Sequence, residues 1–308
     1  MMVGILHRLW ASFFAVYDRR DTSEWEAPPV LERPIYGVYH VYCAPGWQEL
    51  VARQVRHLRE SGLLAVTKTL FVSMAAARPE DAETLKALVD TPKLQLAAVE
   101  QGGGQYEYPA LRQVRRLAFK EDCHLYYFHT KGISYRSLDT DDRLFRSFQR
   151  KMEAWREMME YFVFDRWRVA VHALQAGYDA YGCYQWPPKA YTMFSGNFWW
   201  AASGHVRRLP DFREEVSRDN RFYSEVWLYE VAPRVFSPFE TVADLYYVCI
   251  PRSVYMDAVP ARTDKWRFIL TYNWRKLLKH AFGYSYKQRC QRKYQQLKAL
   301  SEQPSDDA

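Results

Sequence analysis

Residues 125–133 place a His, a Thr and a Lys directly after four large apolar or aromatic residues. A continuous apolar run that ends near a glycine is typical of a strand buried on both faces of a sheet. Such strands belong to α/β sheets, whose ligands bind where the carboxyl ends of the strands stop. Lys131 would supply a positive charge there, His129 and Thr130 hydrogen bonds, and Gly132 a tight turn near the ligand. A polar surface loop after a buried strand is the alternative.

Strand and helix patterns alternate along the part of the chain that leads to this stretch. The alternation predicts an α/β fold with a doubly wound, mostly parallel sheet flanked by helices. Neither GxGxxG after the first strand nor GxxxxGK[ST] occurs, so the dinucleotide fingerprint and the P-loop are absent. We expect strands at residues 35–42, 63–73, 94–99 and in the stretch itself, and helices at 47–61, 79–89, 109–119 and 144–176.

A second segment with glycine among polar residues precedes a run of aromatic residues. Ser195-Gly196-Asn197 enters a strand that contains Trp199 and Trp200, as a backbone approaching a ligand would. Adjacent residues of a strand face opposite sides, so one of the two tryptophans is expected in the core.

The bulk composition describes a well-packed chain. Of the 308 residues, 48% are hydrophobic and 17% aromatic, which argues against wholesale disorder. The five cysteines are dispersed and form no CxxC pair, which favours a reducing compartment and argues against a disulfide framework or zinc site. The chain contains neither the long apolar run of a membrane span nor a typical signal peptide, so we expect a cytoplasmic protein.

Positive charge is concentrated near the end of the chain. The window from Lys265 to Lys298 contains ten Lys or Arg and no Asp or Glu, so the total of +7 leaves −3 for the remainder. Trp and Leu recur in this window at helical spacing, which favours peripheral binding to an anionic inner-membrane surface. Single-stranded nucleic acid and packing on the body of the protein are the alternatives. We expect an N-terminal helix and linker at 1–34, a catalytic domain at 35–250 with halves 35–135 and 136–250, and a basic helical extension at 251–308.

The order of these features resembles the GT-A-fold glycosyltransferases, in particular the family-2-like enzymes of bacterial surface-polysaccharide synthesis that carry an HTKG motif. The similarity covers roughly residues 35–230. It depends on the helix at 109–119, on Phe128-His129-Thr130-Lys131-Gly132, and on a downstream block. That block comprises Ser195-Gly196-Asn197-Phe198-Trp199-Trp200, Leu209-Pro210-Asp211-Phe212 and Ser224-Glu225-Val226-Trp227.

The resemblance implies transfer of a sugar, with inversion, from a UDP- or GDP-type nucleotide-sugar to a glycan or lipid-linked acceptor. Glu225 matches the catalytic carboxylate of the family, which takes the proton of the acceptor hydroxyl. The expected donor-binding residues are Tyr42, Glu100, Thr130, Gly132, Gly196 and Asn197, and the expected acceptor-binding residues are Trp199, Trp200 and Trp227.

The HTKG motif stands where the family usually keeps a metal-binding Asp-X-Asp. A Lys ammonium is not a ligand for the hard cations that prefer oxygen. We therefore expect Lys131 and His129 to offset the charge of the leaving diphosphate without a metal. Recruitment of Mg²⁺ or Mn²⁺ by Asp139 and Asp141 is the alternative. The missing Asp-X-Asp also leaves open a non-catalytic glycan- or nucleic-acid-binding module on a transferase scaffold.

Overall fold

The computed structural model describes residues 13–102, 104–138, 140–185, 192–212, 220 and 222–301. The chain divides into two compact units. The larger comprises residues 20–133 and 159–238, and the smaller contains the described parts of 1–19, 134–158 and 239–308. This division differs from the expected boundaries at 35 and 250. One reason is that β1 (Tyr17–Arg19) pairs antiparallel with β9 (Phe239–Thr241), which joins distant segments of the chain.

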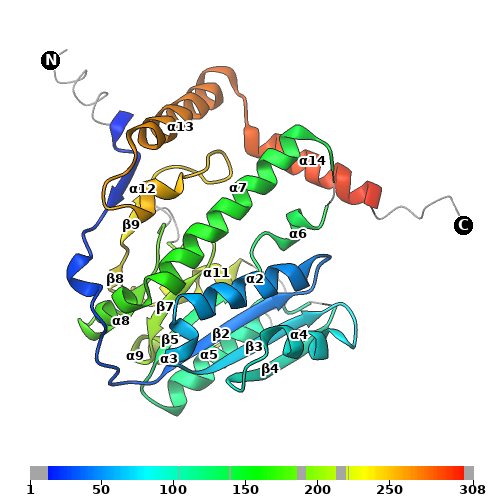
Figure 1. The fold of residues 1–308 in the computed structure, drawn as a ribbon. Helices are drawn as coiled ribbons and strands as arrows, with labels where there is room; N and C mark the ends of the chain where they lie inside the picture. Colours follow the sequence, from blue (N-terminus) through cyan, green and yellow to red (C-terminus); the bar gives the residue numbers. More distant parts are fainter. Residues whose placement is uncertain are drawn as a thin grey trace, which may run out of the picture. The chain divides into compact units, whose positions relative to one another are not determined.

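The larger unit is built on a seven-stranded sheet (Figure 1). Its strand order is β4-β3-β2-β5-β7-β6-β8, and β7 runs antiparallel to both of its neighbours. The other pairs are parallel, so the expectation of a mostly parallel α/β sheet is confirmed. The strands are β2 (Ile35–Tyr42), β3 (Thr67–Ala76), β4 (Leu94–Gln101), β5 (His124–His129), β6 (Ala180–Tyr181), β7 (Trp199–Ala202) and β8 (Val235–Phe236).

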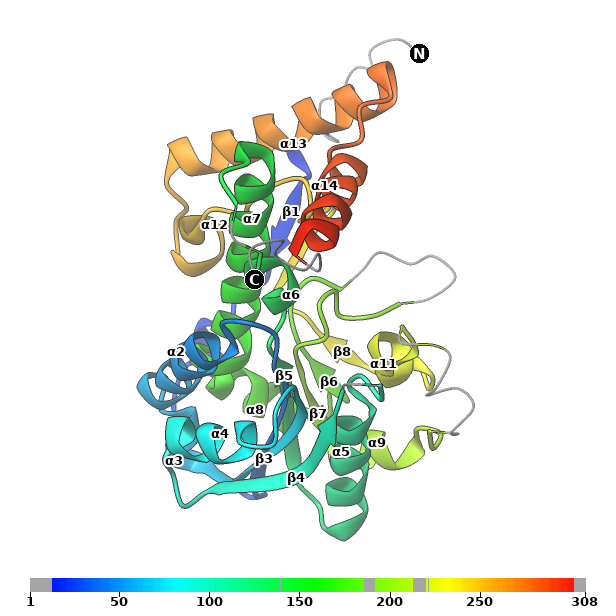
Figure 2. The same cartoon turned by 90° about the vertical axis from the view of Figure 1, so that its right-hand side faces the viewer.

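Helices cover both faces of this sheet, as the view in Figure 2 shows. On one face, Tyr36 and Val38 of β2 join a hydrophobic cluster with α5. On the other face, Tyr39 bonds to Gln54 of α2, because successive strand residues point to opposite sides. The first face carries α5 (Tyr108–Lys120), α9 (Ser203–Arg208) and α11 (Tyr223–Val226). The second carries α2 (Trp47–Glu60), α3 (Leu63–Val66), α4 (Asp81–Val89) and α8 (Trp167–Gln175).

Two expected elements differ from the structure by more than one or two residues at their ends. Residues 63–66 form one turn of helix, so the second strand begins only at Thr67. The helical region expected at 144–176 is interrupted by the π-helical turn Tyr161–Asp165. This turn separates α7 (Arg143–Glu160) from α8.

The smaller unit is mainly helical among its described residues. It contains α12 (Arg252–Met256), α13 (Arg262–Phe282) and α14 (Tyr286–Ser301), besides most of α7. Its packing is aromatic: Phe148 stacks on Tyr246, and Tyr135 meets Tyr294 edge to face. The basic tail of the sequence therefore forms two helices.

The strand order defines where a ligand is expected in the larger unit. Starting at β2, the sheet grows through β3 to β4 on one side and continues with β5 on the other. In open α/β sheets ligands bind outside the carboxyl ends of the strands at such a reversal. Tyr42 ends β2 and His129 ends β5, so the residues singled out above lie at this switch point.

Candidate functional site

His129 is the last residue of β5, and its ring is held by the turn at residues 194–197. Its Nε2 lies 2.9 Å from the carbonyl oxygen of Gly196, so this nitrogen donates and Nδ1 is left as an acceptor. Burial first, and then the charge of Lys131, lower the pKa of His129 to about 4, against the opposing effects of Gly196 and Glu225. We expected both Lys131 and His129 to offset the charge of the diphosphate. The low pKa leaves His129 neutral at pH 7, so the positive charge of the two is that of Lys131.

Lys131 passes close to the backbone of Gly196. A Cβ placed on Gly196 would lie 3.1 Å from Cε of Lys131 and 2.5 Å from Sδ of Met159. Gly196 also has a φ of +101°, which side chains of L-residues rarely adopt. Glycine is thus favoured here by the backbone angle, and an added Cβ would also crowd the side chain of Met159 and, less closely, that of Lys131. That this backbone approaches a bound ligand stays a prediction.

Glu225 completes the group of charged residues expected at this edge. It lies in α11 and is only partly exposed. Its charge raises the pKa of both His129 and Tyr127, which places the carboxylate near these two rings. The charges of Glu225 and Lys131 therefore both act on the ring of His129, although Glu225 comes from a distant part of the chain.

Glu107 belongs to the same site but was missed in the sequence. It is the N-cap residue of α5, and its Oε2 accepts hydrogen bonds from the hydroxyl of Tyr127 at 2.8 Å and from Nδ2 of Asn197 at 2.6 Å. A carboxylate directly before a helix that opens with proline was the available signal, because negative charge is favoured at a helix N-terminus. Glu107 thereby fixes the turn at 194–197 to β5.

Asn197 is a structural residue rather than an open donor-binding group. Its side chain is buried, and its Nδ2 reaches Glu107 and, at 3.4 Å, the carbonyl of Ser224. Its Oδ1 accepts from Nε1 of Trp199 at 2.8 Å. Its φ of 58° lies in the left-handed region that Asn tolerates. The side-chain amide of Asn197 makes all of these contacts within the protein. It therefore holds α11 and β7 in place, and the expected contact with the nucleotide-sugar is not supported.

Thr130 and Gly132 also shape the site through the backbone. The hydroxyl of Thr130 accepts from the backbone nitrogen of Tyr42 at 2.9 Å, and its own nitrogen donates to the carbonyl of His40. Since Thr130 is 3% exposed, its hydroxyl joins the ends of β2 and β5 instead of facing a donor. Gly132 has a φ of +81°, which turns the chain directly after Lys131.

Two rows of side chains run across the sheet beside His129. Directly paired residues of neighbouring strands point to the same face, and the register places Ser73, His40 and His129 in one such row. The hydroxyl of Ser73 and Nδ1 of His40 are buried and have no hydrogen-bond partner within the described chain. Burial also lowers the pKa of His40 to about 4, so its ring is neutral at pH 7.

The next row contains two residues expected to bind the donor. Tyr42 pairs with Ala75, and Ala75 pairs with Glu100. Two strand spacings separate Tyr42 from Glu100 by about 10 Å, with only a methyl group between them. Tyr42 is well exposed, whereas partial burial raises the pKa of Glu100, against the nearby charge of Arg112.

The three tryptophans expected to contact an acceptor lie in the core. Trp199, Trp200 and Trp227 are each at most 1% exposed, and each indole nitrogen donates to an internal oxygen. Burial of one of the first two was expected from strand alternation, but both are enclosed because helices cover both faces of the sheet. None of the three presents a ring face to a sugar in this structure.

The alternative metal site is only partly described. Asp139 lies outside the described residues, and Asp141 is fully exposed with its carboxylate 3.3 Å from Nη2 of Arg146. Within the described part of the chain, no group of three or more His, Cys, Asp or Glu could hold a metal ion.

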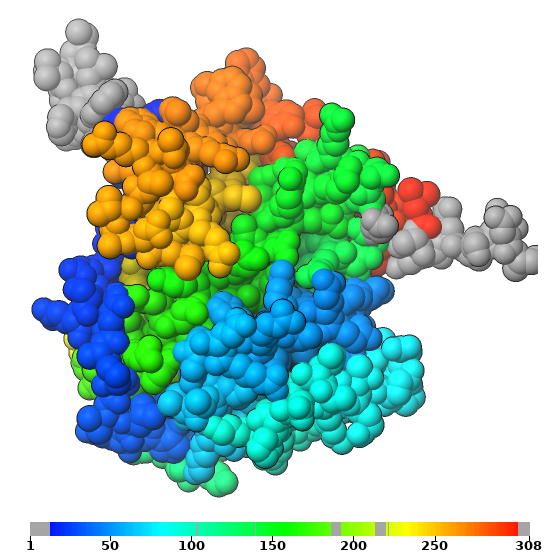
Figure 3. Space-filling model, in the orientation of Figure 1, coloured from blue at the N-terminus to red at the C-terminus, as the bar shows by residue number. Residues whose placement is uncertain are grey.

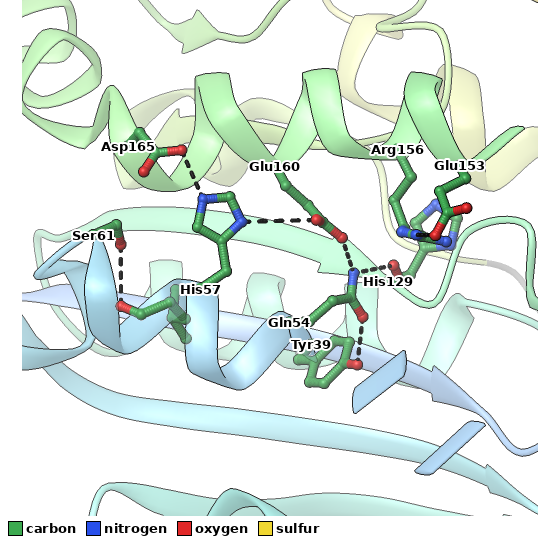
Figure 4. A network of polar contacts seen from close by, with 10 residues as sticks. Tyr39, Gln54, His57, Ser61, His129, Glu153, Arg156, Glu160 and Asp165 are labelled. Carbon is green, nitrogen blue, oxygen red and sulfur yellow. Dashed lines mark hydrogen bonds and ion pairs between the residues drawn. The ribbon is translucent and has the colours of Figure 1, made fainter. Parts of the chain in front are cut away.

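A polar network behind the sheet supports the backbone of His129 (Figure 4). Nε2 of Gln54 donates to the carbonyl of His129 at 3.3 Å and to Oε1 of Glu160 at 2.7 Å, while Oε1 of Gln54 accepts from the hydroxyl of Tyr39. His57 lies 2.7 Å from Oδ2 of Asp165 and 3.7 Å from Oε2 of Glu160. Burial alone would lower the pKa of His57, but these two carboxylates raise it to about 9.

A cavity of about 440 Å³ opens at the other edge of the sheet, where β5 begins. Its lining includes His124, whose ring nitrogens have no hydrogen-bond partner among the described residues, and two ion pairs, Arg207 with Asp122 and Arg208 with Asp179. The paired charges cancel within each ion pair. We therefore place the candidate site at the carboxyl edge, where the charges of Lys131 and Glu225 both act on His129.

The chain was compared with known proteins. No protein-family model matches it, and no curated protein matches it either. Among the helices that the structure describes, none combines the length and apolar character needed to cross a bilayer.

Proposed function

We propose that the protein is a glycosyltransferase of the GT-A type that moves a sugar from a nucleotide-sugar to a hydroxyl of a glycan or lipid-linked acceptor. The observation that supports this most is that the charges of Glu225 and Lys131 both act on His129, which ends β5 at the switch point of the sheet. A carboxylate and an ammonium are the groups that proton removal and stabilisation of a leaving diphosphate require.

In the proposed reaction, Glu225 accepts the proton of the acceptor hydroxyl as its oxygen attacks the anomeric carbon of the donor sugar. A new glycosidic C–O bond forms, and the bond from the anomeric carbon to the diphosphate oxygen breaks. The electron pair of that bond leaves with the nucleoside diphosphate, and the ammonium of Lys131 offsets its charge. Attack opposite the leaving group inverts the configuration of the anomeric carbon.

The neutral His129 has a positioning role in this scheme. Its Nε2 holds the carbonyl of Gly196, and Lys131 passes over the same glycine. The row from Tyr42 to Glu100 is the proposed place of the nucleobase, with the tyrosine ring for stacking and the carboxyl group as a hydrogen-bond acceptor. The proposed reaction uses no metal ion, so Lys131 is the principal positive charge that offsets the diphosphate.

The deciding experiment is a screen of UDP- and GDP-sugars for hydrolysis or transfer, with and without EDTA. We expect turnover that EDTA does not abolish and that Glu225→Gln reduces by about 10²- to 10⁴-fold, because general-base catalysis contributes this much. Calorimetry should show that Glu225→Gln still binds the nucleoside diphosphate. Failure of the wild-type protein to bind any nucleoside diphosphate would overturn the proposal.

Two other outcomes of these experiments would change the proposed function or its mechanism. Loss of turnover in EDTA that is reproduced by Asp141→Asn would replace the role of Lys131 by a metal ion. Nucleotide or glycan binding without turnover under every metal condition would favour the non-catalytic module.

A further inference from the structure

Helix α13 carries a stripe of large apolar side chains at the surface of the protein. The stripe consists of Trp266, Leu270, Trp274 and Leu277, which are 47%, 53%, 57% and 49% exposed. Their spacing of four, four and three residues places them within an arc of about 80° at 100° per residue. Figure 3 shows α13, in orange, at the molecular surface. Four such residues on one helix face form a continuous patch rather than scattered exposed groups.

Other positions of α13 anchor the helix in its own unit. Phe268 and Ile269 are each 1% exposed, and the ring of Phe268 packs on Tyr17. Asp264, the only acidic residue of the helix, accepts a hydrogen bond from Ser253 at 2.6 Å and lies about 160° from Trp266. Trp266, at the start of the stripe, also meets the ring of Phe14 edge to face at 5.5 Å, and Leu270, Trp274 and Leu277 continue the exposed stripe beyond it.

Positive charge borders the stripe. Arg267 lies about 100° from Trp266 on one side, and Lys276 lies about 80° from it on the other. Both are exposed, and no acidic residue occurs between Lys265 and Lys298. Apolar residues that include tryptophan, bordered by Lys and Arg, match the interface of a bilayer, where indoles sit at headgroup level and cations meet anionic lipids.

We infer that α13 is a docking surface for an anionic lipid bilayer, with Trp266, Leu270, Trp274 and Leu277 entering the headgroup–acyl boundary. The helix then lies in the plane of the interface, in keeping with its length and polarity. The aliphatic Leu270 and Leu277 disfavour single-stranded nucleic acid, which uses aromatic rings for stacking. A second copy of the chain is also disfavoured as the partner, because it would bring the Lys and Arg residues that border the two stripes close to one another.

The inference does not rest on sugar transfer, because binding to lipid needs neither donor nor acceptor. The test uses the full chain in co-sedimentation with vesicles of phosphatidylcholine, with or without about one-third phosphatidylglycerol. We expect binding to the anionic vesicles that weakens as salt is added. Leu270→Ser combined with Trp274→Ser should reduce this binding at least tenfold, and Arg267→Gln combined with Lys276→Gln should reduce it on anionic vesicles.

The matched control is Phe119→Ser combined with Val259→Ser. It also removes one aromatic and one aliphatic residue, which are 56% and 84% exposed but lie outside α13. The control should bind vesicles like the wild type, and circular dichroism should show the same helix content in all variants.

Three results would overturn the inference. The first is equal vesicle binding by the stripe variant and the control. The second is absence of vesicle binding together with oligonucleotide binding that the stripe variant loses. The third is a wild-type dimer in sedimentation velocity that the stripe variant dissociates, again without binding to vesicles.

Discussion

The carboxylate of Glu225 and the ammonium of Lys131 act on one imidazole, and their opposite effects on its pKa show how the site is balanced. Burial is the largest influence on His129 and removes its charge at pH 7. A single cation at this edge then has to meet the whole charge of a diphosphate in the proposed reaction. The charge and shape of the side chain at position 131 should therefore have a large effect on activity.

Lys131→Ala should therefore lower kcat/KM for the nucleotide-sugar by about 10²- to 10³-fold, as the loss of a preorganised charge does in other sites. Lys131→Arg should recover part of the activity, because a guanidinium keeps the charge but not the compact shape that fits over Gly196. Steady-state kinetics in EDTA measure both. Equal activity in the Ala variant and the wild type would remove Lys131 from the mechanism.

Asn197 offers a prediction on stability at the same scale. Asn197→Asp would place a second carboxylate against Oε2 of Glu107 in a buried position. We expect a loss of about 3 kcal/mol or more in the free energy of unfolding, because a buried charge is left uncompensated. Urea denaturation at pH 7 measures it. Glu107→Gln added to Asn197→Asp should restore part of the stability by supplying a donor, and absence of any rescue would contradict the pairing.

At the scale of elements, the turn that joins Phe194 to Asn197 positions the site. Its closing hydrogen bond runs from the nitrogen of Asn197 to the carbonyl of Phe194, and it presents the carbonyl of Gly196 to His129. The strand that follows is antiparallel to β5, so the turn arrives at the carboxyl end of β5. A short segment far along the chain thereby completes a site that begins at β2.

Gly196→Ala tests the turn. The added Cβ would meet Sδ of Met159 at 2.5 Å and would be held at a φ of +101°. We expect a loss of about 1–3 kcal/mol in stability from the backbone angle alone, together with a further fall of the His129 pKa, because its hydrogen bond to the carbonyl of Gly196 raises that pKa. NMR titration of the imidazole and thermal unfolding measure the two effects. Gly104→Ala is the control, since nothing lies within 4 Å of its added Cβ.

The sequence predicts the elements here better than it predicts the contacts between them. Apolar runs and helical spacing locate β2, β5, α2 and α5, because these patterns are local. The burial of both Trp199 and Trp200 and the roles of Glu107 and Asn197 depend on helices that cover both faces of the sheet. The neutral state of His129 follows first from its burial, and its ring bonds to Gly196, which is 67 residues away, so no local pattern contains either feature.

At the scale of the molecule, the larger unit is built from two segments of chain, and the polar network behind its sheet joins them. Gln54 and His57 belong to the first segment, and Glu160 and Asp165 to the second. The π-helical turn at 161–165 carries Asp165 toward His57. A charged cluster between distant segments makes the stability of the unit depend on pH.

The sign follows from the pKa of His57, which is about 9 in the folded protein, against an ordinary value of 6.5. The stability that the charged His57 contributes to the folded state is fully present below pH 6.5 and is lost as the pH rises to about 9. The upper bound is about 3 kcal/mol, at 1.36 kcal/mol for each pKa unit. Urea denaturation between pH 6 and pH 9 should show that the stability difference between the wild type and His57→Gln shrinks as pH rises. A constant difference across this range would mean that His57 is not charged by Asp165 and Glu160, and the network would then hold the His129 backbone through neutral hydrogen bonds alone.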